Sequence, residues 1–273
     1  MFDFNKCHPI ELNDLVRIGN EYDGGYILSE RQIERTDTVL SFGVRDDWTF
    51  EEDFAKRKNV KIYSYDYSTK DLPFASRKFV RTYVAIIYNL LRLRCSKAKN
   101  HLKQFRLSKE FYRFFDNKNG RYFIPKFIGQ YDDEQNTCFE TVFKGLGDIE
   151  DMSIFLKMDI EGGEYLCLPQ LLPFLNKLNG MAIEFHNLAV ADMKCEMLLD
   201  EFSKNFYISH VHGCNFGKLI YGTNIPSVLE MTFINKKLVL EKAVLSKRNY
   251  PIVGLDTPCN RFMDDYKLTF NKE

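Results

Sequence analysis

Short apolar runs alternate with amphipathic stretches along most of the chain. The apolar runs are rich in β-branched and aromatic residues, which predicts buried strands, whereas the amphipathic stretches repeat their apolar residues at helical spacing. Regular alternation of strands and helices is typical of an α/β protein with a mostly parallel, doubly wound sheet. The predicted strands cover residues 38–42, 60–66, 127–129, 154–159, 181–186, 207–215 and 227–234, and the predicted helices cover residues 49–58, 137–144, 165–175 and 190–204.

Two places depart from this alternation. The predicted strands 207–215 and 227–234 have no helix between them, which indicates an antiparallel pair at the edge of the sheet. Nearer the start, residues 15–28 contain two short apolar runs around Asp23-Gly24-Gly25, which predicts a hairpin or a tight loop. On spacing alone, a simple turn is the favoured interpretation of this glycine pair.

The sharpest change of character follows the predicted strand 154–159. Its mostly apolar run ends in Asp159 and Glu161, and a glycine pair then leads to Glu164. Open α/β sheets bind their ligands outside the carboxyl ends of the strands, so a ligand is expected here. By themselves the acids suit a metal ion, a ribose or a helix start equally well. Glu164, one turn into the next helix, is predicted to stabilise the helix start rather than take part in chemistry.

The predicted strand 38–42 runs into Gly43 and then into a helix with acidic residues in its first turn. This order is typical of the opening of a nucleotide-binding α/β unit. The G-x-G-x-x-G pattern is absent, which counts against a nicotinamide cofactor. Asp66 ends the second strand about twenty residues later, where such folds place a carboxylate on the ribose hydroxyls. A helix N-cap or a solvated strand end is the alternative interpretation of Asp66.

The amino-acid composition indicates the class of protein and its cellular compartment. A chain of 273 residues with 45% hydrophobic and 28% charged residues is long enough for one large α/β domain. Its seven cysteines form no Cys-x-x-Cys pair, which predicts reduced thiols in the cytoplasm rather than disulfides or a zinc knuckle. We expect no signal peptide and no membrane-spanning helix, because the longest apolar run, residues 83–91, is far short of ~20 residues.

The thirty-eight basic and thirty-eight acidic residues balance, but they are unevenly distributed. Residues 77–121 contain thirteen basic residues against two acids, Glu110 and Asp116. We predict a basic, mostly helical insertion over residues 68–121, because apolar residues recur there at helical spacing, for example Tyr83, Ile86, Ile87, Leu90 and Leu91. Its exposed face is either an ordinary solvated surface or a site for a phosphate-bearing substrate or an anionic surface such as a membrane. Nucleic acid is a less favoured partner, because no recognisable binding module accompanies the charge.

Taken together, these motifs resemble the FkbM-type S-adenosylmethionine-dependent methyltransferases. The most specific part is the complete run Leu156-Lys157-Met158-Asp159-Ile160-Glu161-Gly162-Gly163-Glu164. The other parts are Leu40-Ser41-Phe42-Gly43-Val44, Asp66, Glu184-Phe185-His186 and the strand end from His212 to Asn215. The resemblance covers residues 15–66 and 125–235, with a weaker tail at 255–260, and leaves the insertion out. It implies one methyltransferase domain over residues 1–273, built on a Rossmann-like seven-stranded sheet with an antiparallel last strand.

Members of this family commonly O-methylate hydroxyls of sugars or polyketides, and bacterial members often act in surface-polysaccharide pathways. The resemblance therefore implies an O-methyltransferase that uses S-adenosylmethionine and acts on a sugar hydroxyl, for example in capsule polysaccharide biosynthesis. The basic insertion favours a phosphate-bearing or nucleotide-linked sugar as the acceptor. Two rival hypotheses are a dehydrogenase on the same sheet and a non-catalytic protein that docks an anionic glycolipid or a partner through the insertion.

The resemblance and the spacing together place the cofactor across the Phe42-Gly43 loop, with Asp66 on its ribose hydroxyls. The predicted cofactor-binding residues are Ser41, Phe42, Gly43, Asp66, Asp159 and the loop residues Asp23 and Gly24, which would close over one end of the site. A hydroxyl acceptor needs a base, and we predict His186 in this role, oriented by Glu161 or Asp159, with His212 as a further candidate. The same four side chains form an oxygen-and-imidazole set that suits Mg²⁺ or Mn²⁺, so a metal site is the alternative.

Overall fold

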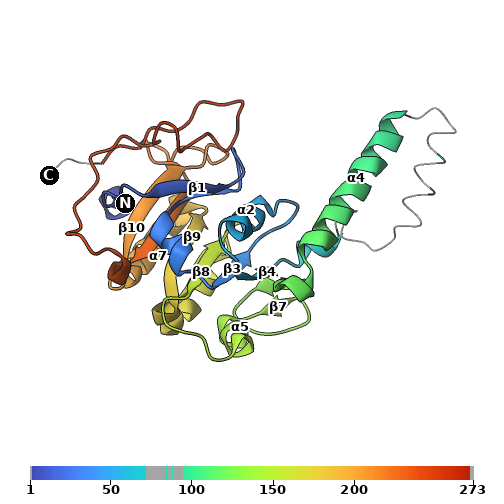
Figure 1. The fold of residues 1–273 in the computed structure, drawn as a ribbon. Helices are drawn as coiled ribbons and strands as arrows, with labels where there is room; N and C mark the ends of the chain where they lie inside the picture. The colour runs from blue at the N-terminus through green and yellow to red at the C-terminus, as the bar shows by residue number, and fades with distance from the viewer. Residues whose placement is uncertain (1, 72–83, 85–87, 89–94, 271–273) are drawn as a thin grey trace.

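The computed structural model describes residues 2–71, 84, 88 and 95–270. A seven-stranded sheet forms the centre of this part of the chain, with the strand order β10-β11-β9-β8-β3-β4-β5 (Figure 1). Its strands run parallel except for β11, which is antiparallel to both neighbours. This order confirms the predicted Rossmann-like methyltransferase sheet. The strands are β3 (Thr38–Phe42), β4 (Lys61–Tyr65), β5 (Arg121–Ile124), β8 (Ile154–Met158), β9 (Leu178–Phe185), β10 (Phe206–Gly213) and β11 (Leu229–Asn235).

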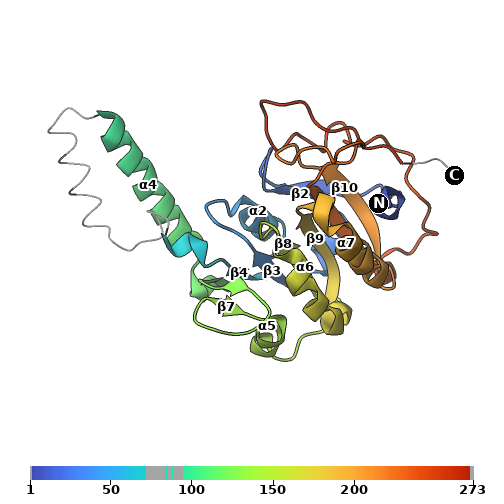
Figure 2. The same cartoon turned by 180° about the vertical axis from the view of Figure 1, so that it is seen from behind.

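Alternate residues of a strand point to opposite faces of the sheet, and each face has its own covering helices. On one face, Leu40 and Leu156 belong to a core completed by α5, α7 and the 3₁₀ helix η4. On the other face, Val39 and Phe155 pack with α1 and α2. Figure 2 shows α6 and α7 side by side against the strands. The helices are α1 (Glu30–Arg35), α2 (Thr49–Arg57), α5 (Phe139–Leu146), α6 (Glu164–Cys167) and α7 (Leu188–Phe202), with the 3₁₀ helices η1 (Phe4–Cys7), η2 (Ser68–Asp71), η3 (Asn117–Asn119), η4 (Leu168–Lys177) and η5 (Lys236–Leu238).

Two prolines decide how the segment after β8 folds. Helix α6 ends at Cys167, and η4 follows with Pro169 near its start and Pro173 inside it. Proline has no backbone N–H and its ring clashes with the carbonyl four residues earlier, so a regular α-helix does not continue here. The predicted helix over residues 165–175 is therefore divided, and α6 stays short beside the carboxyl end of β8.

Both departures from strand-helix alternation form antiparallel pairs. β1 (Leu15–Gly19) and β2 (Gly25–Ser29) form a hairpin, which confirms the predicted turn around Asp23-Gly24-Gly25. β10 and β11 are also antiparallel, as predicted. Of this pair only β10 lies at a sheet edge, however, because β11 turns back and inserts between β9 and β10. The wholly buried residues of β11 fit this interior position.

The edge strand β5 is missed by the sequence pattern and lies at the end of the predicted insertion. It pairs with β4 from Ile62–Arg121 to Tyr65–Ile124, and its residues are only half-buried. The strand is only four residues long and begins at Arg121, the last residue of the predicted insertion, which explains why its short apolar run, Tyr122 to Ile124, is not among the predicted strands. The predicted strand at 127–129 forms instead β6 (Phe127–Ile128), which pairs with β7 (Asn136–Thr137) outside the main sheet.

Helix α4 (Cys95–Phe114) lies within the predicted insertion and projects from the rest of the molecule in both ribbon views (Figure 1 and Figure 2). Its carboxyl end is anchored by aromatic packing, because the Phe111 ring lies 5.4 Å from that of Trp48 and 5.0 Å from that of Phe123. No helix among the described residues is long and apolar enough to cross a membrane. The predicted apolar positions Tyr83, Ile86, Ile87, Leu90 and Leu91 lie outside the described residues.

Candidate functional site

A cavity of about 870 Å³ opens at the carboxyl ends of β3, β4 and β8. The strand order reverses between β3 and β8, since the chain continues outward to β4 on one side and to β9 on the other. Open α/β sheets bind ligands at this kind of switch point. The walls include Gly43 to Asp47 after β3, Tyr65 and Asp66 at β4, Asp159 to Glu161 after β8, Asp23 and Gly24 in the β1–β2 turn, and Phe127, Ile128 and Asn136 of β6 and β7.

Gly43 lets the backbone after β3 pass directly against the backbone after β8. It has φ +85°, and a Cβ at this position would lie 1.6 Å from the carbonyl oxygen of Asp159. The Asp159 N–H donates to the Phe42 carbonyl at 3.0 Å, which holds the two loops together. Lys157 donates from Nζ to the Gly43 carbonyl at 2.9 Å. Only glycine fits this contact, because other residues carry a Cβ and disfavour positive φ.

Asp66 is buried, lines the cavity and also acts as a cap. Its Oδ1 accepts hydrogen bonds from the Ser68 N–H at 2.7 Å, the Ser68 hydroxyl at 2.6 Å and the Thr69 N–H at 3.2 Å. Its Oδ2 accepts from the Arg45 N–H at 2.6 Å. A carboxylate oxygen has two acceptor sites, so Oδ2 is able to accept one further hydroxyl. The two interpretations of Asp66, ribose carboxylate and helix cap, are thus compatible.

Two of the predicted cofactor-binding side chains do not reach the cavity. Ser41 is fully buried and its hydroxyl donates to Glu51. Phe42 is also fully buried, with its ring 5.1 Å from that of Tyr65 and 5.5 Å from that of Phe139. Both residues belong to β3 itself, whose side chains point into the two cores, so the cavity begins only at Gly43.

Asp23 and Gly24 line the cavity, as the proposed role of their loop requires. Asp23 lies at the rim of the cavity and is only partly covered by other residues. This partial burial, together with the charges of Glu230 and Asp159, raises its pKa to about 6. Lys157 opposes this shift. The loop therefore adds one more acid to a region that already carries several carboxylates.

His186 lies closest to Glu164, which is not one of its predicted orienting partners. The His186 Nδ1 lies 3.0 Å from Oε1 of the fully buried Glu164, whereas its Nε2 is 3.9 Å from Asp159 and 3.7 Å from Glu161. Glu164 also accepts from the Gly162 N–H at 3.1 Å, so it does support the start of α6. Burial lowers the pKa of His186, but the Glu164 hydrogen bond and the nearby carboxylates outweigh burial and raise it.

Charged side chains form a row across the sheet beside this histidine. Glu184 on β9 is directly opposite Glu230 on β11, and Glu230 is directly opposite His212 on β10. Burial, followed by the charges of Asp159 and Glu230, raises the pKa of Glu184 well above its ordinary value. Neither Glu184 nor Glu230 is among the site residues that the sequence predicts. In the sequence, each of them could have been noticed as a charged residue inside an otherwise apolar strand. That Glu184 and Glu230 lie side by side follows only from the register of the strands.

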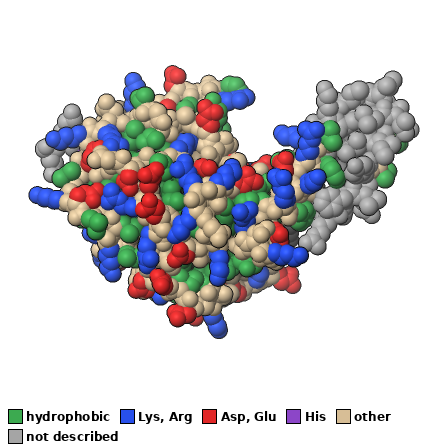
Figure 3. All heavy atoms as spheres, in the orientation of Figure 1, with side chains coloured by type: hydrophobic (Ala, Val, Ile, Leu, Met, Phe, Trp, Pro, Cys, Tyr) green, Lys and Arg blue, Asp and Glu red, His purple; other side chains and the backbone are tan. Residues whose placement is uncertain are grey.

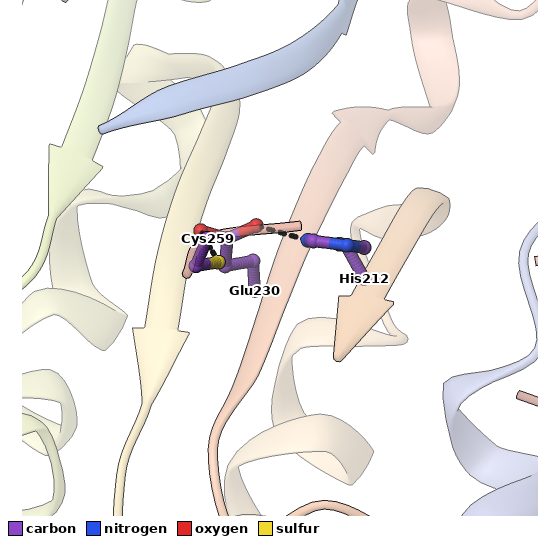
Figure 4. Close-up of side chains that lie close together, drawn as sticks. All are labelled: His212, Glu230 and Cys259. Atoms are coloured by element: carbon purple, nitrogen blue, oxygen red, sulfur yellow. Dashed lines mark hydrogen bonds and ion pairs between the residues drawn. The ribbon is translucent and has the colours of Figure 1, made fainter. Parts of the chain in front are cut away.

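His212 has no free ring nitrogen. Its Nδ1 lies 2.8 Å from Glu230 (Figure 4). Its Nε2 lies 3.0 Å from Asp265, in the segment that follows β11. The Cys259 thiol lies 3.6 Å from the second Glu230 oxygen. Burial lowers the pKa of His212, but the hydrogen bonds that the ring makes to Asp265 and Glu230 raise it well above its ordinary value. The structure therefore places His212 as a link between β10 and the C-terminal segment, away from the residues that line the cavity.

The basic side chains of α4 lie elsewhere. Lys103, Arg106 and Lys109 are exposed, and Figure 3 shows blue side chains along this helix beside the grey residues. No described residue of α4 lines the cavity. In the described part of the insertion, the basic side chains of α4 therefore form part of the outer surface of the molecule.

Comparisons with known proteins give distant structural likenesses. No protein-family model and no curated protein matches the chain at a significant level. An rRNA methylase from Streptococcus thermophilus is 10% identical over 76% of this chain and 92% of its own, with a TM-score of 0.36. The fibrillarin pre-rRNA processing protein of Methanococcus jannaschii is 9% identical over 86% and 76%, with a TM-score of 0.35. A precorrin-6y C5,15-methyltransferase from Geobacter metallireducens is 10% identical over 75% and 86%, with a TM-score of 0.32.

Proposed function

We propose that the protein transfers a methyl group from S-adenosylmethionine to a hydroxyl of a small acceptor molecule. The observation that carries this proposal is the cavity at the β3–β8 switch point, with the Gly43 backbone and Asp66 on one side and Asp159 and Glu161 on the other. Its volume of about 870 Å³ is within the range of cofactor and small-ligand sites. The Leu156 to Glu164 motif supports the same assignment.

The cofactor side of the site is formed by Gly43, Asp66 and the Asp23-Gly24 loop. Asp66 Oδ2 accepts a ribose hydroxyl beside the Arg45 N–H that it already binds. Gly43 lines the cavity, and the methionine part of the cofactor lies against the backbone at this position. The Asp23-Gly24 loop closes the rim. Ser41 and Phe42 support this region from the core.

The transfer itself is an in-line displacement. The acceptor oxygen forms a bond to the methyl carbon while the carbon–sulfur bond breaks, and the bonding electron pair stays on sulfur as S-adenosylhomocysteine leaves. The protein aligns oxygen, carbon and sulfur and provides a group for the hydroxyl proton. Asp159 and Glu161 line the acceptor side of the cavity and take this proton. His186 does not line the cavity, so in this mechanism it acts through Asp159 and Glu161 and not on the acceptor directly.

We infer from the family resemblance that the acceptor is a sugar, for example in bacterial surface-polysaccharide or capsule biosynthesis. The basic insertion supports a phosphate-bearing or nucleotide-linked sugar. The exposed position of Lys103, Arg106 and Lys109 supports a second candidate role, the docking of an anionic glycolipid or partner. These two roles of the insertion are compatible with one catalytic domain.

Calorimetry with S-adenosylhomocysteine and NAD tests the cofactor class directly. We expect saturable binding of S-adenosylhomocysteine and none of NAD. A screen of nucleotide sugars with methyl-labelled cofactor then identifies the acceptor. Binding of NAD alone would favour the dehydrogenase, and the absence of binding by either compound would favour a non-catalytic protein. Transfer only to phosphate-free acceptors would contradict the role given to the basic insertion.

A further inference from the structure

We propose that Asp159, Glu184 and His186 bind a divalent metal ion, for which Mn²⁺ is the best match. Their ligand atoms all lie within 4.8 Å of one another. Two carboxylates and one imidazole form a mixed oxygen and nitrogen set, which Mn²⁺ accepts. The binding itself is independent of the proposed function, whereas the chemical role of the ion rests on it.

The spacing around His186 is too wide for hydrogen bonds and suits ligands around one ion. The His186 Nε2 is 3.6 Å from Glu184 Oε1 and 3.9 Å from Asp159 Oδ1. Ligands bound at ~2.1 Å to an octahedral ion lie ~3 Å apart when adjacent and ~4.2 Å apart when opposite. The observed separations fall between these limits, so only small side-chain adjustments bring all three atoms onto one ion.

His186 is already oriented to bind a metal ion through Nε2. Its Nδ1 is engaged by Glu164 at 3.0 Å, which leaves Nε2 as the free ligand atom. Metal-binding histidines commonly donate their other N–H to a carboxylate in this way, which fixes the tautomer and the ring orientation. Tyr165 adds a second restraint, because its hydroxyl donates to the His186 carbonyl at 2.7 Å.

Two buried polar groups point to a missing cation. The Glu184 side chain is 6% exposed and takes part in no hydrogen bond within the described residues. The Tyr26 hydroxyl is fully buried and has no hydrogen-bond partner there either. Burial, followed by the charges of Asp159 and Glu184, raises the pKa of Tyr26 well above its ordinary value. A buried carboxylate without a hydrogen bond is costly, and a bound cation removes that cost.

The neighbouring His212, Glu230 and Cys259 group is a weaker metal site. Both ring nitrogens of His212 already contact carboxylates, and the two oxygens of Glu230 contact His212 and Cys259 (Figure 4). A metal ion there would have to displace these contacts. The Asp159, Glu184 and His186 group loses no hydrogen bond when an ion binds.

An ion at this position lies directly behind the acceptor side of the cavity, because Asp159 belongs to both. A divalent ion lowers the pKa of a hydroxyl that binds it, as it does for water. Asp159 then serves as a ligand, and Glu161, which lines the cavity and is 80% exposed, accepts the hydroxyl proton. This division of roles deepens the proposed methyl transfer without changing its products.

Electron paramagnetic resonance with Mn²⁺ alone tests the site on the full chain after EDTA treatment and desalting. We expect one Mn²⁺ per chain, with nitrogen coupling from one imidazole in the pulsed spectrum. Glu184→Gln should weaken binding at least tenfold, and His186→Gln should do the same and remove the nitrogen coupling. Glu164→Gln should weaken binding by roughly ten- to a hundredfold through His186. Circular dichroism verifies that each variant is folded, and Asp159→Asn replaces Glu184→Gln if the latter is not.

Asp23→Asn is the matched control, because Asp23 belongs to the other nearby acidic group, formed with Glu184 and Glu230. Retained Mn²⁺ binding in this variant supports the assignment, and a loss equal to that of Glu184→Gln overturns it. No Mn²⁺ binding by the native chain at millimolar concentration also overturns the proposal. S-adenosylhomocysteine binding by the metal-free chain is measured separately. The cofactor assignment and the metal assignment therefore fail independently.

Discussion

Gly43 and Asp159 meet at the floor of the cavity, where a Cβ on residue 43 would lie 1.6 Å from the Asp159 carbonyl oxygen. This contact joins the loop on the cofactor side of the site to the loop on the acceptor side. The close approach exists only because residue 43 has no side chain and adopts φ +85°. The relative position of the two halves of the site therefore depends on one glycine.

Gly43→Ala should destabilise the protein and weaken S-adenosylhomocysteine binding. The positive φ alone costs ~1–2 kcal/mol for a residue with a Cβ, and the clash with Asp159 adds to this cost. Urea unfolding and calorimetry measure the two effects. Gly145→Ala is the control, because no atom lies within 4 Å of its added Cβ and alanine is the better helix former. Equal stability of the two variants would contradict the close contact.

Asp66→Asn should weaken binding of S-adenosylhomocysteine by ~1.5–3 kcal/mol, the usual cost of a lost charged hydrogen bond. Calorimetry measures the change. Asp116→Asn is a matched control, because Asp116 also caps a 3₁₀ helix, accepting from the Lys118 N–H at 3.0 Å, and is absent from the cavity lining. If Asp66→Asn bound S-adenosylhomocysteine as tightly as Asp116→Asn does, the assignment of Asp66 to the ribose hydroxyls would be wrong.

His186→Ala should keep cofactor binding and lose methyl transfer by roughly 10²–10⁴-fold, the contribution typical of a positioned acid, base or ligand. Single-turnover transfer from labelled cofactor measures the rate, and calorimetry measures the binding. His8→Ala serves as a control, because His8 contacts the Ser246 carbonyl and lies outside the cavity lining. Native turnover by His186→Ala would remove this residue from the mechanism.

His212 should stabilise the fold most strongly in acid. The folded-state pKa of His212 is raised well above the unfolded value, so its contribution is complete below pH ~6.5 and is lost as pH rises through the folded pKa. We therefore expect His212→Gln to be destabilised by ~3–5 kcal/mol at pH 6 and by less at pH 9. Urea unfolding of both proteins at each pH measures the difference. A difference that grew with pH would contradict the buried ion pairs with Glu230 and Asp265.

Charge reversal on α4 should leave the cavity unaffected. The triple variant Lys103→Glu, Arg106→Glu and Lys109→Glu is expected to bind S-adenosylhomocysteine normally, because no described residue of α4 lines the cavity. If the helix docks on anionic surfaces, the variant should lose flotation with phosphatidylglycerol vesicles. The control reverses three exposed lysines elsewhere, Lys144, Lys218 and Lys242. Equal losses in both variants would show a general charge effect rather than a docking helix.

The amino-acid sequence by itself determined the order of the elements and the nature of the sheet. Central strands such as β3, β8 and β9 are buried on both faces, so they appear as apolar runs that a linear pattern detects. The same pattern located Gly43, Asp66 and Asp159 at strand ends, and each lines the cavity. The edge strand β5 has only a three-residue apolar run at the end of the predicted insertion, and the pattern missed it.

Only the tertiary structure decided which polar groups meet. The register of β9, β11 and β10 aligns Glu184, Glu230 and His212, although these residues are far apart along the chain. The fold of the loop after β8 brings Glu164 to His186, where Asp159 or Glu161 was the predicted partner. Burial patterns are local and can be seen in a linear sequence, whereas contacts between strand ends depend on register and loop path. The residue types at the site were therefore predictable, and their pairings were not.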